Sequence, residues 1–133
     1  MADIDLASKV SLARLDNYDP TATKTALRKL LQPLGGMQAF VQPGQKVLLK
    51  PNLLSGKPPE KAVTTHPEIV RGVIELVLEA GGLVSVGDSP GIGTAENVAR
   101  KAGIMEVIEE TGARFVPFEQ SIKIKTANGT FHE

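Results

Sequence analysis

Short apolar runs alternate with stretches of helical periodicity along this chain, and this alternation constrains its fold most strongly. The runs "KVLLK", "LVSVGD" and "RFVPF" have the length and composition of strands, and "KVSLARL" alternates apolar and polar residues. Strands that alternate with helices imply right-handed crossovers and a mostly parallel sheet. The sequence therefore predicts an α/β fold: a three-layer, mostly parallel sheet with covering helices. The predicted strands are residues 10–15, 46–50, 83–87 and 114–118.

The helices are predicted from apolar spacing and from residues that begin or end helices. Asp19 can cap a helix whose first residue is Pro20, and Gly81 is placed to end a helix that starts near His66. Thr65 and Glu68 match the capping-box pattern for that second helix. Two further helices are predicted at residues 94–102 and 104–111. The run at residues 46–50 has a continuous apolar centre, Val47 to Leu49, which is typical of a central strand covered on both faces.

Composition narrows the class of protein. The chain has 133 residues, 41% of them hydrophobic, which suits one domain with a real core. Fifteen basic and fifteen acidic residues cancel, so neither nucleic acid nor a membrane surface is a predicted partner. There is no membrane-spanning run and no leader pattern, and we expect a cytoplasmic protein. Cysteine is absent, and the two histidines, His66 and His132, cannot by themselves supply a structural zinc site, although carboxylates could complete one; no metal site is predicted.

The last residues of the chain suggest an unfinished unit. Asn128 and Gly129 form a strong hairpin-turn signal, yet only four residues follow them. We therefore expect residues 1–133 to be a single α/β domain, the N-terminal part of a longer protein and a fragment of a larger domain.

Two loops are the best candidates for a ligand site. In an open parallel sheet, ligands bind outside the carboxyl ends of the strands. Lys50 and Asn52 leave one predicted strand, and Asp88 and Ser89 leave the next. The loop between Pro51 and the second helix is longer than most strand-to-helix connections, and such loops are usually functional or mobile. The sequence predicts that the two loops share a crevice.

The second loop, "GDSPGIGT", invites a phosphate-binding interpretation because glycines let backbone amides approach an anion. It lacks the third glycine of the dinucleotide fingerprint, and "SGKPP" in the first loop fails as a P-loop. Structural roles compete with ligand roles here: Lys50 as a solvated charge, Asp88 and Ser89 as turn residues, and Thr65 as a helix cap. His66 would lie in the first helical turn, either exposed or facing the cleft.

The resulting prediction is a site for a small anionic ligand. Lys50 and Asn52 would hold the anion, and His66 or Asp88 is the candidate for proton transfer. The predicted ligand-binding residues are Lys50, Asn52, Thr65, His66, Asp88 and Ser89.

Four segments carry a family resemblance: "KVLLKPNLLSG", "AVTTHPEIVRGVIELVLEAGG", "VGDSPGIG" and "GIMEVIEETGARFVPFE". Together they resemble the N-terminal part of the domain of unknown function 362 family, over nearly the whole chain. Many members resemble iron-sulfur proteins and carry a ferredoxin-like cysteine segment. The resemblance implies a redox association. Because this chain has no cysteine, we expect no cofactor in it, and an iron-sulfur cluster would either belong to the full-length protein, beyond Glu133, or be absent.

The sequence thus leaves three functions open. The leading one is a redox-associated α/β domain that binds an anionic small ligand at the carboxyl edge of its sheet, within an iron-sulfur-linked protein. The second is a noncatalytic domain that docks an electron-transfer partner, which predicts an exposed apolar or charged patch. The third is a metal-assisted hydrolase that uses Asp88 and His66 with a divalent ion.

Overall fold

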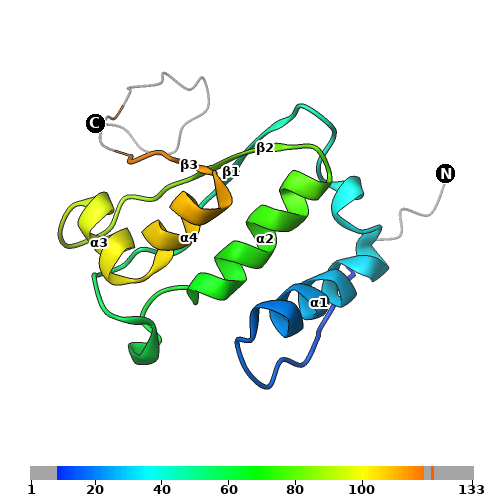
Figure 1. The fold of residues 1–133 in the computed structure, drawn as a ribbon, viewed down its shortest axis with the longest axis horizontal. Coiled ribbons are helices and arrows are strands. Elements are labelled where there is room, and N and C mark those ends of the chain that lie inside the picture. Colours follow the sequence, from blue (N-terminus) through cyan, green and yellow to red (C-terminus); the bar gives the residue numbers. More distant parts are fainter. Residues whose placement is uncertain (1–8, 119–120, 122–133) are drawn as a thin grey trace, which may run out of the picture.

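A computed structural model describes residues 9–118 and residue 121, so the predicted turn at Asn128 and Gly129 lies outside the described residues. The fold is a parallel sheet of three strands in the order β1-β2-β3 with helices packed against it (Figure 1). The strands are β1 (Lys46–Leu49), β2 (Leu83–Val86) and β3 (Arg114–Phe115). The helices are α1 (Pro20–Leu31), α2 (Pro67–Glu79), α3 (Ala95–Lys101) and α4 (Ile104–Thr111), with short 3₁₀ turns at Gln32–Leu34, Met37–Ala39 and Pro59–Lys61. The predicted α/β class and parallel sheet are confirmed.

The helices pack side by side. Helix α2 connects β1 to β2, and α3 with α4 connects β2 to β3. Helix α2 lies between α1 and α4 and contacts both (Figure 1). Because the strands are parallel, their carboxyl ends share one edge of the sheet, and α2 begins near that edge.

The two faces of the sheet differ. Val47, Leu49, Val84, Val86 and Phe115 belong to or pack against the hydrophobic core shared with the helices. On the other face, Leu48 is 53% exposed and Leu83 is 57% exposed. Within the described residues the helices thus cover one face of the sheet, and no described helix covers the second face. The expectation that the first apolar run forms a central strand is wrong for these residues, because β2 is central and β1 lies at the edge.

The strand predicted at residues 10–15 is also not observed, because residues 9–15 are irregular. Val10 is 81% exposed and Leu12 is 92% exposed. A short alternation identifies a period of two, but a strand also needs a partner, and no pairing to this segment occurs in the described sheet.

Proline residues lie near the ends of two elements. The predicted strand at residues 114–118 stops at Phe115, two residues before Pro117, although the amide of Val116 still donates to the carbonyl of Val86 at 2.9 Å. Helix α1 starts as predicted, with Asp19 accepting from the amide of Ala22 at 2.8 Å. Helix α2 instead has Pro67 as its first residue, and its cap is His66.

The predicted cap at Thr65 is therefore wrong, and the reason is steric. A residue before proline is disfavoured in the helical region, so His66 cannot be the first helical residue. Pro67 has a fixed φ that suits the first helical position. The Nδ1 atom of His66 accepts a hydrogen bond from the amide of Glu68 at 3.2 Å.

In the part of the chain that the structure describes, no helix is long and apolar enough to cross a bilayer.

Candidate functional site

The two predicted loops meet at the carboxyl edge of the sheet. Nζ of Lys50, directly after β1, lies 2.7 Å from Oδ1 of Asp88. Oδ2 of Asp88 accepts a hydrogen bond from the backbone amide of Leu53 at 2.9 Å. Asp88 is only 4% exposed, and Leu53 is 1% exposed and part of the core. The predicted convergence of Lys50 and Asp88 is confirmed, whereas ligand binding by these residues stays a prediction.

Asp88 is held in its ionised form. Burial by itself would raise the pKa of this carboxyl, because desolvation disfavours the charge. Hydrogen bonds from the Lys50 side chain and from the backbone amides of Leu53 and Ser89 outweigh burial and lower the pKa. Both carboxylate oxygens accept hydrogen bonds, and a carboxylate with a lowered pKa is a weak base. Asp88 thus links the second loop to the first through its contacts with Lys50 and Leu53.

The loops pack closely along the line between them. A Cβ built on Gly91 would lie 3.8 Å from the carbonyl oxygen of Leu54, which is an ordinary contact. Farther along, a Cβ on Gly56 would lie 2.9 Å from Cδ of Lys101. The first loop thus packs against the second loop at Gly91 and against the end of α3 at Lys101. Two open spaces are lined by residues of the first loop.

The first open space, which we call the Lys50 hollow, has a volume of about 300 Å³. Lys50, Pro51 and Thr65 line it from the first loop, and Leu48, Ile69 and Val73 are among the apolar residues that line it from β1 and α2. Two predicted site residues, Lys50 and Thr65, thus share one hollow. The Lys50 side chain is 61% exposed. The arrangement is a cation and a hydroxyl beside an apolar wall.

The second open space, which we call the Lys57 hollow, has a volume of about 390 Å³. Ser55, Gly56 and Lys57 line it from the first loop, and Gly93, Asn97 and Lys101 line it from the second loop and α3. Sequence reasoning missed these residues. The signal was present in "SGK" and "GIG", but only the fold shows that Lys101, from the end of α3, joins them.

His66 does not line either hollow. Its ring stacks on Tyr18, with ring centroids 3.6 Å apart and the planes inclined by 5°. Because Nδ1 accepts from the amide of Glu68, the neutral ring carries its proton on Nε2. His66 therefore starts α2 and joins it to the segment before α1. Its predicted alternatives were an exposed position or one facing the cleft, and the structure shows it half-buried under Tyr18.

The remaining predicted residues, Asn52 and Ser89, are exposed on the two loops. Neither residue lines the Lys50 hollow or the Lys57 hollow. Among the described residues, no three His, Cys, Asp or Glu side chains are grouped so that they could hold a metal ion.

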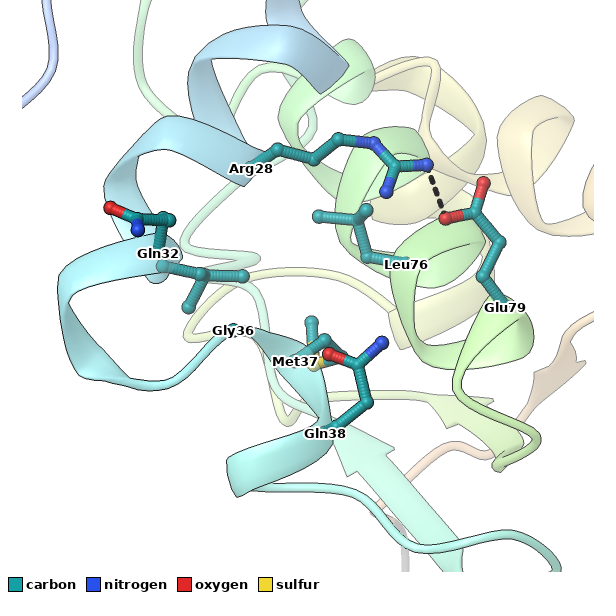
Figure 2. A pocket seen from close by; sticks show the side chains of 8 residues that line it. Arg28, Gln32, Gly36, Met37, Gln38, Leu76 and Glu79 are labelled. Carbon is teal, nitrogen blue, oxygen red and sulfur yellow. Dashed lines mark hydrogen bonds and ion pairs between the residues drawn. The ribbon is translucent and has the colours of Figure 1, made fainter.

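A third hollow lies at the opposite end of α2, between α1, α2 and the turn at Met37–Ala39 (Figure 2). Its volume is about 170 Å³. Arg28 is paired with Glu79 across its rim, as the dashed line in Figure 2 marks. Since the guanidinium already has a carboxylate partner, this hollow offers an anion less than the Lys57 hollow, which no described carboxylate lines.

Comparison with known proteins places this edge within a family. The family model described as a domain of unknown function, DUF362, matches residues 47–133, a span that contains Lys50 and Asp88. The chain belongs to the DUF362 family. The resemblance noted in the sequence is thus confirmed, and the two loops that meet at Asp88 are part of the DUF362 domain itself.

One curated relative is a thylakoid-associated protein of Synechocystis sp. (strain ATCC 27184 / PCC 6803 / Kazusa). It is 44% identical over 113 residues, which cover 85% of this DUF362 chain and 35% of the relative. The chain therefore spans about a third of the length of that relative. No solved structure matches the chain.

Proposed function

We propose that this DUF362 domain binds a small anion with an apolar body in the Lys50 hollow. The observation that supports this function is that Lys50 and Thr65 stand beside an apolar wall that includes Ile69 and Val73. A pocket with a few polar groups on an apolar lining is the usual form of a small-molecule site. Lys50 and Thr65 hydrogen-bond the anionic group of the ligand, and the apolar residues of the hollow contact its apolar part.

The pairing with Asp88 shapes this binding. An ammonium group has three donor hydrogens, and Asp88 takes one of them, so Lys50 keeps donors for a ligand. The salt bridge also holds the Lys50 side chain in place. Because the pair as a whole is neutral, charge attraction alone is weak. Affinity therefore depends on hydrogen bonds to the head and on burial of the apolar body.

Hexanoate is a suitable probe for this function, with hexylamine and hexanol as matched controls. We expect hexanoate to cause saturable shifts in the backbone amide signals of Lys50, Thr65 and Val70 in nitrogen-labelled protein. Lys50→Gln should weaken hexanoate binding about tenfold, since one charged hydrogen bond contributes roughly 1.5–3 kcal/mol. Lys46→Gln is the charge-matched control, because Lys46 is exposed on β1 but does not line this hollow.

Two results would contradict the proposal. Hexylamine binding as well as hexanoate would show that no anion preference exists. Equal weakening by Lys46→Gln and Lys50→Gln would show that the effect is general charge rather than a site at Lys50.

We further propose that the full-length protein is redox-associated and iron-sulfur-linked, and that it acts in the cytoplasm. The family resemblance supports the redox part, and this chain contributes the ligand-binding domain rather than the cluster. Iron and acid-labile sulfide measured in the full-length protein, purified without oxygen, test this part. Absence of both from freshly purified protein would contradict it.

Docking of an electron-transfer partner is the second candidate function, and the sheet face that no described helix covers favours it. Leu48 and Leu83 are half exposed there, and Lys46 and Arg114 share the face by register. Basic residues beside apolar ones suit an acidic partner surface. An acidic [2Fe–2S] ferredoxin is the probe, and docking predicts salt-sensitive shifts at the amides of Leu83 and Arg114, which line neither hollow. Shifts confined to the two hollows would contradict it.

The metal-assisted hydrolase gains no support from the geometry. Asp88 uses both oxygens on Lys50 and Leu53, and His66 uses Nδ1 on the amide of Glu68. Metal ligation at these atoms would have to displace contacts that hold the first loop and start α2.

A further inference from the structure

We infer that the Lys57 hollow is a second anion site, one that binds the phosphate group of a small molecule. This site is separate from the Lys50 hollow, and the inference does not rest on the function proposed above. Two lysines from different parts of the chain, Lys57 and Lys101, line the same open space of about 390 Å³.

Charge is the first argument. Among the residues that the structure describes, no carboxylate lines the Lys57 hollow. Among the ion pairs of the described residues, neither Lys57 nor Lys101 takes part in any. The acidic residue of α3 nearest in sequence, Glu96, is paired with Arg100 at 3.1 Å. Two ammonium groups without a carboxylate partner among the described residues make this hollow locally positive, although the whole chain is neutral.

Local geometry brings the lysines together. The amide of Lys57 donates to the carbonyl oxygen of Ser55 at 2.9 Å, which turns the loop tightly at this point. Gly56, in the middle of the turn, lets the chain lie against the Lys101 stem, because a Cβ there would lie 2.9 Å from Cδ of Lys101. This close approach places the turn and the end of α3 on the same hollow. Lysine is a compact cation with rotatable donors and commonly binds phosphate.

The other lining residues indicate the class of ligand. Ser55 and Asn97 add a hydroxyl and an amide, which can hydrogen-bond phosphate oxygens. Ile92 also lines the hollow and is 77% exposed, so it offers an apolar contact at the rim. A small phosphate monoester with a short apolar or aromatic group matches this combination.

Phenyl phosphate is the probe that tests this site, with phenol as its uncharged control. The nitrogen-labelled 133-residue chain is titrated at low salt while its backbone amide signals are followed. We expect saturable shifts at Gly56, Gly93 and Asn97 with phenyl phosphate but not with phenol. The affinity should fall as salt is added, because exposed charges are screened.

Two double variants distinguish binding at the Lys57 hollow from nonspecific attraction to positive charge on the protein surface. Lys57→Gln with Lys101→Gln should weaken phenyl phosphate binding about tenfold or more, since each removes a charged hydrogen-bond donor. Lys29→Gln with Lys46→Gln removes the same charge from exposed lysines that line neither hollow, and should leave the affinity unchanged. If the first double variant loses its native spectrum, the two single variants are compared instead, each expected to weaken binding severalfold.

The outcomes are distinguishable from those of the proposed function. Shifts that stay linear in phenyl phosphate, or equal weakening by the two double variants, would overturn the inference. Shifts strongest at Lys50 and Thr65 would also overturn it, because phosphate would then bind in the first hollow. Loss of hexanoate binding at the Lys50 hollow leaves the inference standing if Gly56, Gly93 and Asn97 respond to phenyl phosphate as expected.

Discussion

The backbone amide of Leu53 donates a 2.9 Å hydrogen bond to Oδ2 of Asp88, 35 residues away along the chain. This contact joins the loop after β1 to the loop after β2. Because Leu53 is also part of the hydrophobic core, the bond fixes the point at which the first loop enters the interior. The second oxygen of Asp88 positions Lys50. One buried carboxylate thus sets the geometry of the whole carboxyl edge.

Replacement of Asp88 by asparagine should lower the free energy of unfolding at pH 7 by about 1–2 kcal/mol, because the charge on the Lys50 pair is lost. The folded-state pKa of Asp88 is lowered, so its contribution is fully present above the ordinary aspartate pKa of about 4 and is lost as the pH falls through the folded-state pKa. Urea unfolding of both proteins between pH 7 and pH 2 measures this difference. It should shrink only below about pH 4.

Asp16→Asn is the matched control for this measurement. Asp16 also pairs with a cation, Arg14, at 2.7 Å, but its side chain is 72% exposed. We expect a change within about 0.5 kcal/mol, because exposed pairs contribute little. An Asp88→Asn protein as stable as the wild type at pH 7 would show that Asp88 does not fasten the loops.

A His66→Ala variant should lose about 1 kcal/mol of stability, because the amide of Glu68 loses its capping acceptor. His66→Asn should recover most of this loss, since asparagine is a strong cap. Both variants lose the stacking on Tyr18, so their difference reports the cap alone. Urea unfolding midpoints check the order. If His66→Asn were no more stable than His66→Ala, the hydrogen bond at the start of α2 would not contribute to stability.

The meeting of Lys50 and Asp88 could be predicted because it follows from topology. Strands that are parallel end at the same edge, so residues directly after two neighbouring strands must lie close. The pattern of short apolar runs was sufficient for that step. By contrast, the alternation of apolar and polar residues at residues 10–15 indicated a strand but did not identify a strand with which it could pair. Val10 is exposed and lies outside the sheet.

Other parts of the site could not be predicted because they depend on distances between remote residues. The capping-box pattern at Thr65 and the proline at residue 67 predict different first residues for α2. The helix begins at Pro67, whose fixed φ suits the first helical position. The Lys57 hollow exists because Gly56 and Lys101 approach closely, and no periodicity in the sequence reports such an approach.

Thr23→Val should stabilise the domain by about 1 kcal/mol, because a methyl group replaces a hydroxyl that is buried without a partner. Thr23 is 0% exposed on α1, and its Oγ1 atom has no hydrogen bond among the described residues. Thr25→Val, at an exposed position of the same helix, is the control and should change stability by less than about 0.5 kcal/mol. A destabilised Thr23→Val protein would show that the hydroxyl has a partner in solution. Thermal and urea unfolding measure both.

Gly87, at the end of β2 and next to Asp88, should not tolerate even alanine. A Cβ at Gly87 would lie 1.8 Å from the carbonyl oxygen of Val116, and backbone cannot move aside as the end of a side chain can. The amide of Val116 donates to the carbonyl of Val86, so relief of the clash would also strain this last ladder bond at 2.9 Å. We expect Gly87→Ala to cost about 3 kcal/mol, at the upper end for overpacking.

Gly91→Ala is the control for this change, because its Cβ would meet the carbonyl oxygen of Leu54 at an ordinary 3.8 Å. We expect it to alter stability by less than about 0.5 kcal/mol. Since Gly87 adjoins Asp88, its alanine variant should also displace the carboxylate, and the amide signals of Leu53 and Ser89 should shift even where the protein stays folded. Urea unfolding and backbone amide spectra of the two variants decide the matter. Equal stability of Gly87→Ala and Gly91→Ala would mean that Val116 does not approach β2 as closely in solution.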